Sequence, residues 1–234
     1  MSNDYSDIGF QINDEADFSA LHTAHPELLA RRENIYGETA ELFSPDGRAE
    51  LWYYADENGV FGCYAEPGYH SGRSTEVVPQ KWLPGAVLEV ETAICPLTVA
   101  VPGVFLAPLE LNKPCNMELT LFARNLEAYE NADTFVEKHE GSTAPESIIP
   151  YGSFSLPKKE EEFAPDAVAE VSGVITEVAL RENPIHRWMY YEIGLSCLGV
   201  EFTVVANADL LLEPPQVGNI LHGFYWVSGR MTDI

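Results

Sequence analysis

Positive charge is scarce in this sequence. Only 13 Lys and Arg residues accompany 37 Asp and Glu residues in a chain of 234, which gives a formal net charge of −24 at pH 7 and a sequence pI of about 4.4. Proteins that bind DNA, RNA or anionic membranes gather Lys and Arg into patches that neutralise phosphate groups. Because a surface rich in carboxylates repels phosphate, we expect neither nucleic acid nor a membrane among the partners.

Long apolar runs and closely spaced cysteines are also missing. The sequence has no run of about 18 apolar residues, the length that a membrane-spanning helix needs, and residues 1–7 lack the basic start and apolar stretch of a secretory signal. The four cysteines form no Cys-x-x-Cys pair and have no His at a zinc-ligand spacing. We therefore expect a cytoplasmic protein with buried, reduced thiols at Cys63, Cys95, Cys115 and Cys197.

The common catalytic signatures are absent as well. The sequence has no Gly-x-Ser-x-Gly, no dinucleotide-binding glycine pattern and no phosphate-binding Gly-Lys-Ser/Thr loop. His22 and His25 are three residues apart on a predicted helix, but they match no zinc-binding pattern and Pro26 disturbs the helix there. We predict no catalytic residue, no metal site and no cofactor.

The hydrophobic content is nevertheless that of an ordinary globular chain, with 46% hydrophobic and 11% aromatic residues. The first part of the sequence predicts a short strand at Ile8–Ile12 and a helix that begins after Asn13. Asp-Gly and Asn-Gly pairs then separate three strand-like runs at residues 40–43, 49–55 and 60–64. We interpret these runs as a three-stranded antiparallel meander.

Strand signals also dominate the later sequence. Residues 142–166 are rich in Pro, Ser, Lys and Glu and are typical of a solvated linker. The remaining elements are a short helix at 131–139, a helical turn at 207–211, and strands at 87–94, 117–123, 167–180, 188–197, 200–206 and 220–226.

The segment after the predicted linker has a recognisable order of elements. A long strand interrupted by Gly173 precedes two more strands, a helical insert and a strand introduced by Val217-Gly218-Asn219-Ile220. This order resembles an OB-fold barrel. The segment departs from that family because a fifth strand is missing, unless residues 227–231 or an upstream segment supply it.

The fold class that we predict is α+β, mainly β. It comprises an N-terminal αβ meander region over residues 1–141, the linker 142–166 and a C-terminal OB-like antiparallel barrel over 167–234. The element order in residues 8–64 is also similar to a glyoxalase-like (vicinal oxygen chelate) module. Short phrases, among them Ser147–Gly152, resemble bacterial proteins of unassigned function, and this similarity implies no activity.

Two groups of residues are candidates for binding. Alternation on the strand at 188–197 places Trp188, Tyr190 and Glu192 on the face opposite the core. This face could be a stacking platform of the type that OB barrels use for ligands, and the alternatives for Trp188 and Tyr190 are cover of a domain interface, binding of a protein partner or simple core packing. Residues 167–234 contain eight acids and three Arg, a net charge of −5, which argues for a protein surface rather than a nucleic acid as the partner. The second group is Glu66, Tyr69 and His70, which we place on one glycine-flanked loop.

We expect a non-catalytic module that binds a protein partner, for which a basic surface would be the electrostatic complement. Self-association into a homo-oligomer is also open. An alternative from another class is a small-molecule or metal-dependent enzyme with its site near Glu66 and His70. A third interpretation is mimicry of nucleic-acid charge, and adaptation to high salt would produce the same acidity.

Overall fold

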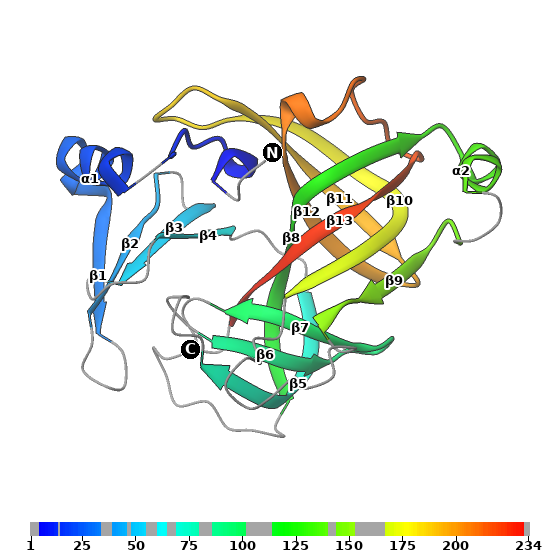
Figure 1. The fold of residues 1–234 in the computed structure, drawn as a ribbon, viewed down its shortest axis with the longest axis horizontal. Coiled ribbons are helices and arrows are strands. Elements are labelled where there is room, and N and C mark those ends of the chain that lie inside the picture. Colours follow the sequence, from blue (N-terminus) through cyan, green and yellow to red (C-terminus); the bar gives the residue numbers. More distant parts are fainter. Residues whose placement is uncertain are drawn as a thin grey trace.

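The computed structural model is β-rich, with a small N-terminal sheet beside a larger system of strands (Figure 1). It describes residues 5–13, 15–33, 39–45, 48–54, 60–64, 69–79, 86–101, 114–139, 144–152 and 167–231.

The N-terminal sheet has four antiparallel strands that pair in sequence order, β1-β2-β3-β4. Our prediction had three strands and missed β1, because Leu28 and Leu29 continue the apolar pattern of the preceding helix. In the structure, the 3-10 helix η2 (Pro26–Leu28) ends that pattern and the chain then becomes extended. The bounds are α1 (Glu15–Ala24), β1 (Leu29–Glu33), β2 (Thr39–Phe43), β3 (Ala49–Tyr54) and β4 (Val60–Tyr64).

Five strands of the larger system close into a barrel. Neighbours β8–β13, β13–β10, β10–β11 and β11–β12 are antiparallel, and a short parallel pairing of β12 with β8 closes the ring. A closed ring leaves no strand edge unpaired along these contacts. The five strands are β8 (Pro114–Tyr129), β10 (Val168–Glu182), β11 (Met189–Cys197), β12 (Val200–Asn207) and β13 (Ile220–Met231).

This barrel is compatible with an OB-like barrel, and an upstream segment supplies the missing strand. That segment is β8, which precedes the other four strands in sequence. Residues 227–231 form no separate strand, because they continue β13 and pair with residues 117–121 of β8. The division of the chain into 1–141, 142–166 and 167–234 stays a prediction, although the barrel pairing crosses it.

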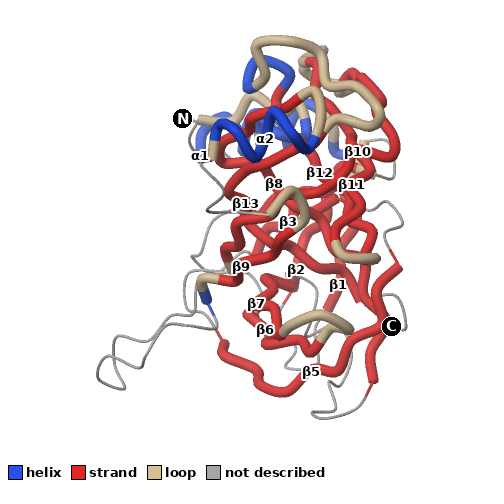
Figure 2. Tube along the Cα trace, turned by 90° about the vertical axis from the view of Figure 1, so that its right-hand side faces the viewer, coloured by secondary structure: helices blue, strands red, loops and turns tan. Residues whose placement is uncertain are grey.

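The long strands β8 and β13 also carry a second group of strands at their other end. β5 (Tyr69–Pro79) pairs with the first residues of β8, β6 (Ala86–Glu91) lies between β5 and β7 (Pro96–Val101), and β7 contacts β13 at Ser228. Figure 2 shows the two groups at opposite ends of the molecule, with α2 (Ala132–Lys138) at the barrel end. The edge strand β9 (Ser147–Pro150) pairs with β10.

Two apolar clusters hold these layers together. The larger one fills the interior with side chains from β6, β7, β8 and the other barrel strands, among them Leu121, Leu195 and Val227. The second lies outside the barrel, where Ile8, Phe10 and residues of the N-terminal sheet pack on Phe122, Tyr190 and Trp226. The N-terminal segment is therefore part of the folded core.

The predicted strand at Ile8–Ile12 is wrong. Residues Ser6–Ile8 form the 3-10 helix η1, and the N–H groups of Gly9 and Phe10 donate back to the carbonyl oxygens of Ser6 and Tyr5. Side chains of the barrel hold the segment on either side of these residues. Asn183 Nδ2 donates to the carbonyl oxygen of Ile8 at 2.9 Å, and the backbone N–H of Gln11 donates to His186 Nδ1 at 2.7 Å. The apolar alternation is explained by burial, since Ile8, Phe10 and Ile12 all point into the second cluster.

Candidate functional site

The outer face of β10, β11 and β12 carries the candidate site. Side chains that point away from the barrel interior alternate along β11, so Tyr190, Glu192 and Gly194 lie on this face while Ile193 and Leu195 are buried inside. The N-terminal segment covers Tyr190. Beyond this covered part, the face is open around Gly194.

A β-bulge shapes the open part of the face. The pairing of β10 with β11 shifts between Ile175 and Glu177, which places Thr176 and Glu177 directly over Gly194. A Cβ atom at Gly194 would lie 2.7 Å from Thr176 Oγ1 and 3.2 Å from Glu177 Cβ. Position 194 is therefore glycine because two neighbouring side chains occupy the space above it.

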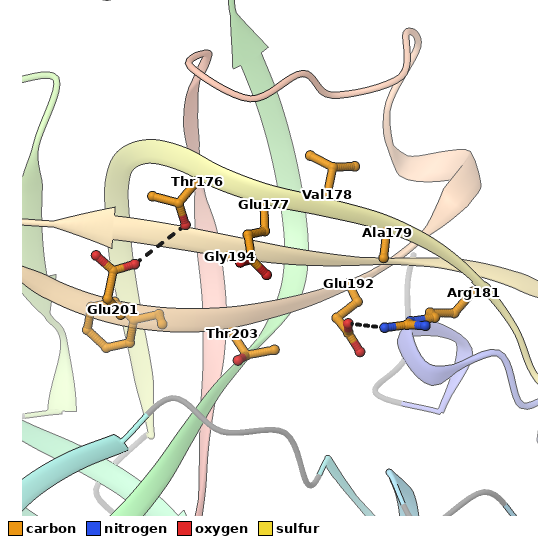
Figure 3. A pocket seen from close by; sticks show the side chains of 10 residues that line it. Thr176, Glu177, Val178, Ala179, Arg181, Glu192, Gly194, Glu201 and Thr203 are labelled. Atoms are coloured by element: carbon orange, nitrogen blue, oxygen red, sulfur yellow. Dashed lines mark hydrogen bonds and ion pairs between the residues drawn. The ribbon is translucent and has the colours of Figure 1, made fainter.

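A pocket of about 430 Å³ opens on this face, within the range of small-ligand sites. Each of the three strands contributes one glutamate to its lining, which also includes two threonines, one arginine and apolar residues (Figure 3). The lining residues are Thr176, Glu177, Val178, Ala179, Arg181, Glu192, Gly194, Glu201, Phe202 and Thr203.

The three carboxylates of the pocket differ in their partners. Glu192 is held from two sides, with Oε1 2.7 Å from Arg181 and Oε2 3.0 Å from Arg48. Glu177 and Glu201 are exposed and form no ion pair with any residue of the described ranges; Glu201 has only a long contact of 3.5 Å with Thr176 Oγ1. The pocket thus presents two carboxylates that are open to a ligand.

The three candidate binding residues on the strand at 188–197 have different surroundings in the structure. Glu192 lines the pocket and Trp188 is 40% exposed. Tyr190 is 1% exposed and packs in the second cluster. The N-terminal segment covers the ring of Tyr190, which rules out stacking of a ligand on this ring and agrees with the interface and core-packing alternatives.

The second predicted group falls in a different setting. Tyr69 and His70 begin strand β5, where their backbones pair with Glu118 and Met117 of β8. The loop predicted for them is therefore wrong from Tyr69 onward. Glu66 lies outside the described residues.

His22 and His25 contact carboxylates, and the described cysteines Cys95 and Cys197 are half-buried and buried. His22 Nε2 lies 2.9 Å from Glu41, and His25 Nδ1 lies 3.4 Å from Glu27. Within the described ranges, no three His, Cys, Asp or Glu side chains are grouped as metal ligands. Burial raises the pKa of the Cys197 thiol to about 12 and also raises that of Cys95, so both thiols are protonated.

Sequence reasoning missed most of the pocket. Glu177, Glu201 and Arg181 contribute only to the net charge of residues 167–234 in the sequence, and Arg48 belongs to a turn 144 positions away from its partner. The one local signal was Gly194, since glycine inside a strand marks a bulge or a close approach.

Comparison of the chain with protein-family models, curated proteins and solved structures finds no match in any of the three. The likenesses to a glyoxalase-like module and to bacterial proteins of unassigned function therefore gain no support. Within the described part of the chain, α1 has 10 residues and α2 has 7, and no helix there has the length and apolar content for crossing a bilayer.

Proposed function

We propose that this protein is a non-catalytic binding module that takes a basic segment of a protein partner on the outer face of β10–β12. The pocket with its two exposed carboxylates, Glu177 and Glu201, neither of which forms an ion pair with a described residue, is the observation that carries the proposal. An ammonium or guanidinium group would gain charge-assisted hydrogen bonds there. Thr203 and Thr176 add hydroxyl groups that accept or donate further hydrogen bonds.

The similarity to an OB-like barrel also supports the outer face of β10–β12 as the binding face. If β10 is taken as the first strand of an OB-like barrel, β11 and β12 are the second and third, on which OB barrels commonly bind ligands. Aromatic stacking by Tyr190 is blocked, and the carboxylates disfavour phosphate. A cationic side chain of a protein needs no exposed aromatic ring and pairs with carboxylates, so it is the ligand that fits this face.

The pocket lining favours binding over acid–base catalysis. Among its ten residues it contains no His, Cys or Lys, so an imidazole base, a thiolate and an amine nucleophile are absent from the lining. Of its three glutamates, which could act as acids or bases, Glu192 is held by two arginines. The enzyme alternative near Glu66 and His70 stays a prediction, as does the cytoplasmic location.

A hexa-arginine peptide is a suitable probe, with binding measured by calorimetry at about 0.15 M salt. We expect the double variant Glu177→Gln/Glu201→Gln to lose about tenfold or more in affinity, since two charge-assisted contacts are removed. The matched control is Glu137→Gln/Glu213→Gln, which removes the same charge from two exposed residues outside the pocket.

The control should bind the peptide almost as well as the unchanged protein. Equal losses in the two double variants would mean that the peptide senses only the overall charge of −24, and the proposed site would then be wrong.

A further inference from the structure

Helix α2 is attached to the outside of the barrel by few side chains. It has seven residues, of which Phe135 is the buried one, and such a short helix is not stable without tertiary contacts. Phe135 packs in a small cluster with Tyr129 of β8, Ile220 of β13 and the partly buried Val174 of β10. The position of α2 therefore depends on contacts around this one ring.

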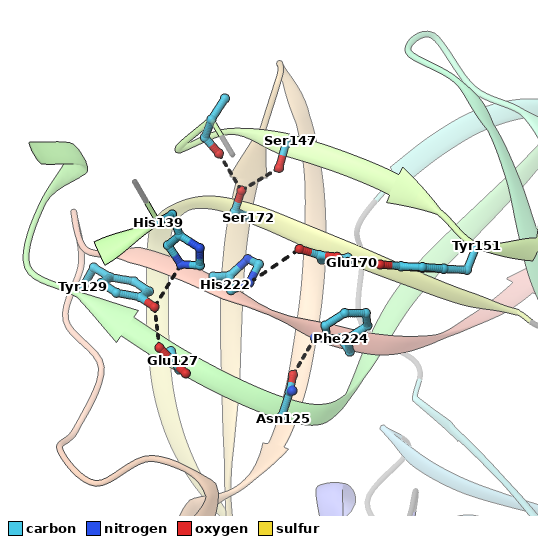
Figure 4. A network of polar contacts seen from close by, with 11 residues as sticks. Asn125, Glu127, Tyr129, His139, Ser147, Tyr151, Glu170, Ser172, His222 and Phe224 are labelled. Carbon is cyan, nitrogen blue, oxygen red and sulfur yellow. Dashed lines mark hydrogen bonds and ion pairs between the residues drawn. The ribbon is translucent and has the colours of Figure 1, made fainter. Parts of the chain in front are cut away.

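Two histidines complete that cluster (Figure 4). His139 follows the last residue of α2 and stacks on Phe135, with ring centroids 4.3 Å apart. His222 comes from β13 and meets Phe135 edge-on at 5.7 Å. The centroids of the two imidazole rings are only 4.9 Å apart. A positive charge on the His222 ring would therefore lie directly between the helix and the barrel.

The His139 side of the cluster is joined to β8. The Tyr129 hydroxyl donates to the Glu127 carboxylate, and it lies 3.1 Å from His139 Nε2. Because the phenol proton is directed to Glu127, the neutral imidazole donates from Nε2 to the Tyr129 oxygen. Lys138 also faces this group, with Nζ 5.0 Å from the centre of the Tyr129 ring.

The His222 side of the cluster faces a carboxylate of β10. His222 Nε2 lies 3.7 Å from Glu170 Oε1, which is longer than a hydrogen bond, and Glu170 Oε2 accepts from Tyr151 at 2.8 Å. His222 Nδ1 is buried and has no hydrogen-bond partner among the described residues. Ser172, paired with His222 across the strands, donates its proton to the carbonyl oxygen of Ala144.

The balance of these surroundings favours the neutral ring of His222. Burial lowers its pKa below the usual 6.5, and the nearby His139 lowers it further, whereas Glu170 and Glu127 act in the opposite direction without reversing the shift. When α2 leaves, the ring loses the cover of Phe135 and His139 but keeps Glu170. Protonation is therefore easier in the open state.

We propose that His222 acts as a pH-sensitive latch: packed against His139 and Phe135, it keeps α2 on the barrel while the His222 ring is neutral and releases α2 when that ring becomes charged. The direction follows from linkage. The open state takes up a proton more readily, so acid favours it. Docking is complete above the ordinary histidine pKa of 6.5 and weakens as the pH falls below that value.

Hydrogen exchange of the α2 amides tests this latch in the full-length protein. The informative amides are those of Phe135 and His139, which donate to Asn131 and Phe135 carbonyl oxygens. After correction for intrinsic exchange rates, we expect their protection to fall several-fold between about pH 7.5 and about pH 5. His222→Phe keeps an aromatic ring without a titrating group, and its protection should be the same at both values.

The control His25→Gln removes an imidazole on the N-terminal side of the molecule and should respond to pH as the unchanged protein does. A pH response of His222→Phe equal to that of the unchanged protein would overturn the proposal. If that variant does not fold, NMR titration of the unchanged protein decides. The His222 ring and the α2 amides must then shift together, and titration of the ring with unmoved α2 amides also overturns it.

Discussion

Glu192 connects two parts of the molecule that lie far apart in sequence. Its side chain is 14% exposed and holds Arg181 of the neighbouring strand and Arg48 of the turn before β3. Charge-assisted hydrogen bonds of a half-buried carboxylate stabilise more than exposed pairs do, because the charges are less screened by water. This one residue therefore both shapes the pocket and fixes the N-terminal sheet on the barrel.

Replacing Glu192 by Gln should lower the free energy of unfolding by about 1 kcal/mol, since both Arg partners remain partly exposed and regain some hydration. Urea denaturation measures the change. The matched control is Glu182→Gln, whose partner Arg187 is 75% exposed and whose loss should cost less than about 0.5 kcal/mol. Equal effects of the two variants would contradict the connecting role of Glu192.

Side-chain alternation predicted which residues of β11 face the barrel interior, but not that another segment covers part of its outer face. The pattern placed five residues on the inner face. Ile193, Leu195 and Cys197 are buried in the interior, Tyr191 is partly buried, and Met189 is 37% exposed. Tyr190 is buried for another reason, since the N-terminal segment, about 180 positions earlier, packs over it. The periodicity of one strand does not indicate which distant segment packs on it. For the same reason the sequence pattern could not predict the ion pair between Arg48 and Glu192.

At the level of elements, strand β8 decides where the barrel begins. It pairs with β13 over most of its length and with β12 by the short parallel contact. Sequence patterns located the strand at 117–123 but gave no reason to join it to strands beyond residue 167. The neighbours of a strand depend on closure of the whole sheet, and hairpin turns specify only neighbours that are adjacent in sequence.

A fragment of residues 167–234 should therefore not fold, because it would leave the edges of β12 and β13 without their partner. We expect a cooperative urea transition for residues 114–234 and none for 167–234. The longer fragment should still be less stable than the full chain, since it exposes Phe122 and Trp226 of the second cluster. A cooperative transition for residues 167–234 would show that β8 is not required.

For the whole molecule, the charge of −24 acts on stability and on binding in opposite ways. The carboxylates repel one another in the compact state, and this repulsion opposes folding. The same carboxylates attract a cationic partner and speed its approach. Both effects operate through exposed charges, so dissolved salt screens both.

Raising NaCl from about 50 mM to about 500 mM should therefore increase the urea midpoint of the protein while it weakens binding of the hexa-arginine peptide. Urea is the suitable denaturant because it adds no ions of its own. The Glu177→Gln/Glu201→Gln variant should show the same gain in stability but a smaller loss of binding, since its pocket has fewer charges to screen. Equal peptide affinity at both salt concentrations would remove the electrostatic basis of the proposed function, and an unchanged urea midpoint would show that the carboxylates are too dispersed to strain the fold.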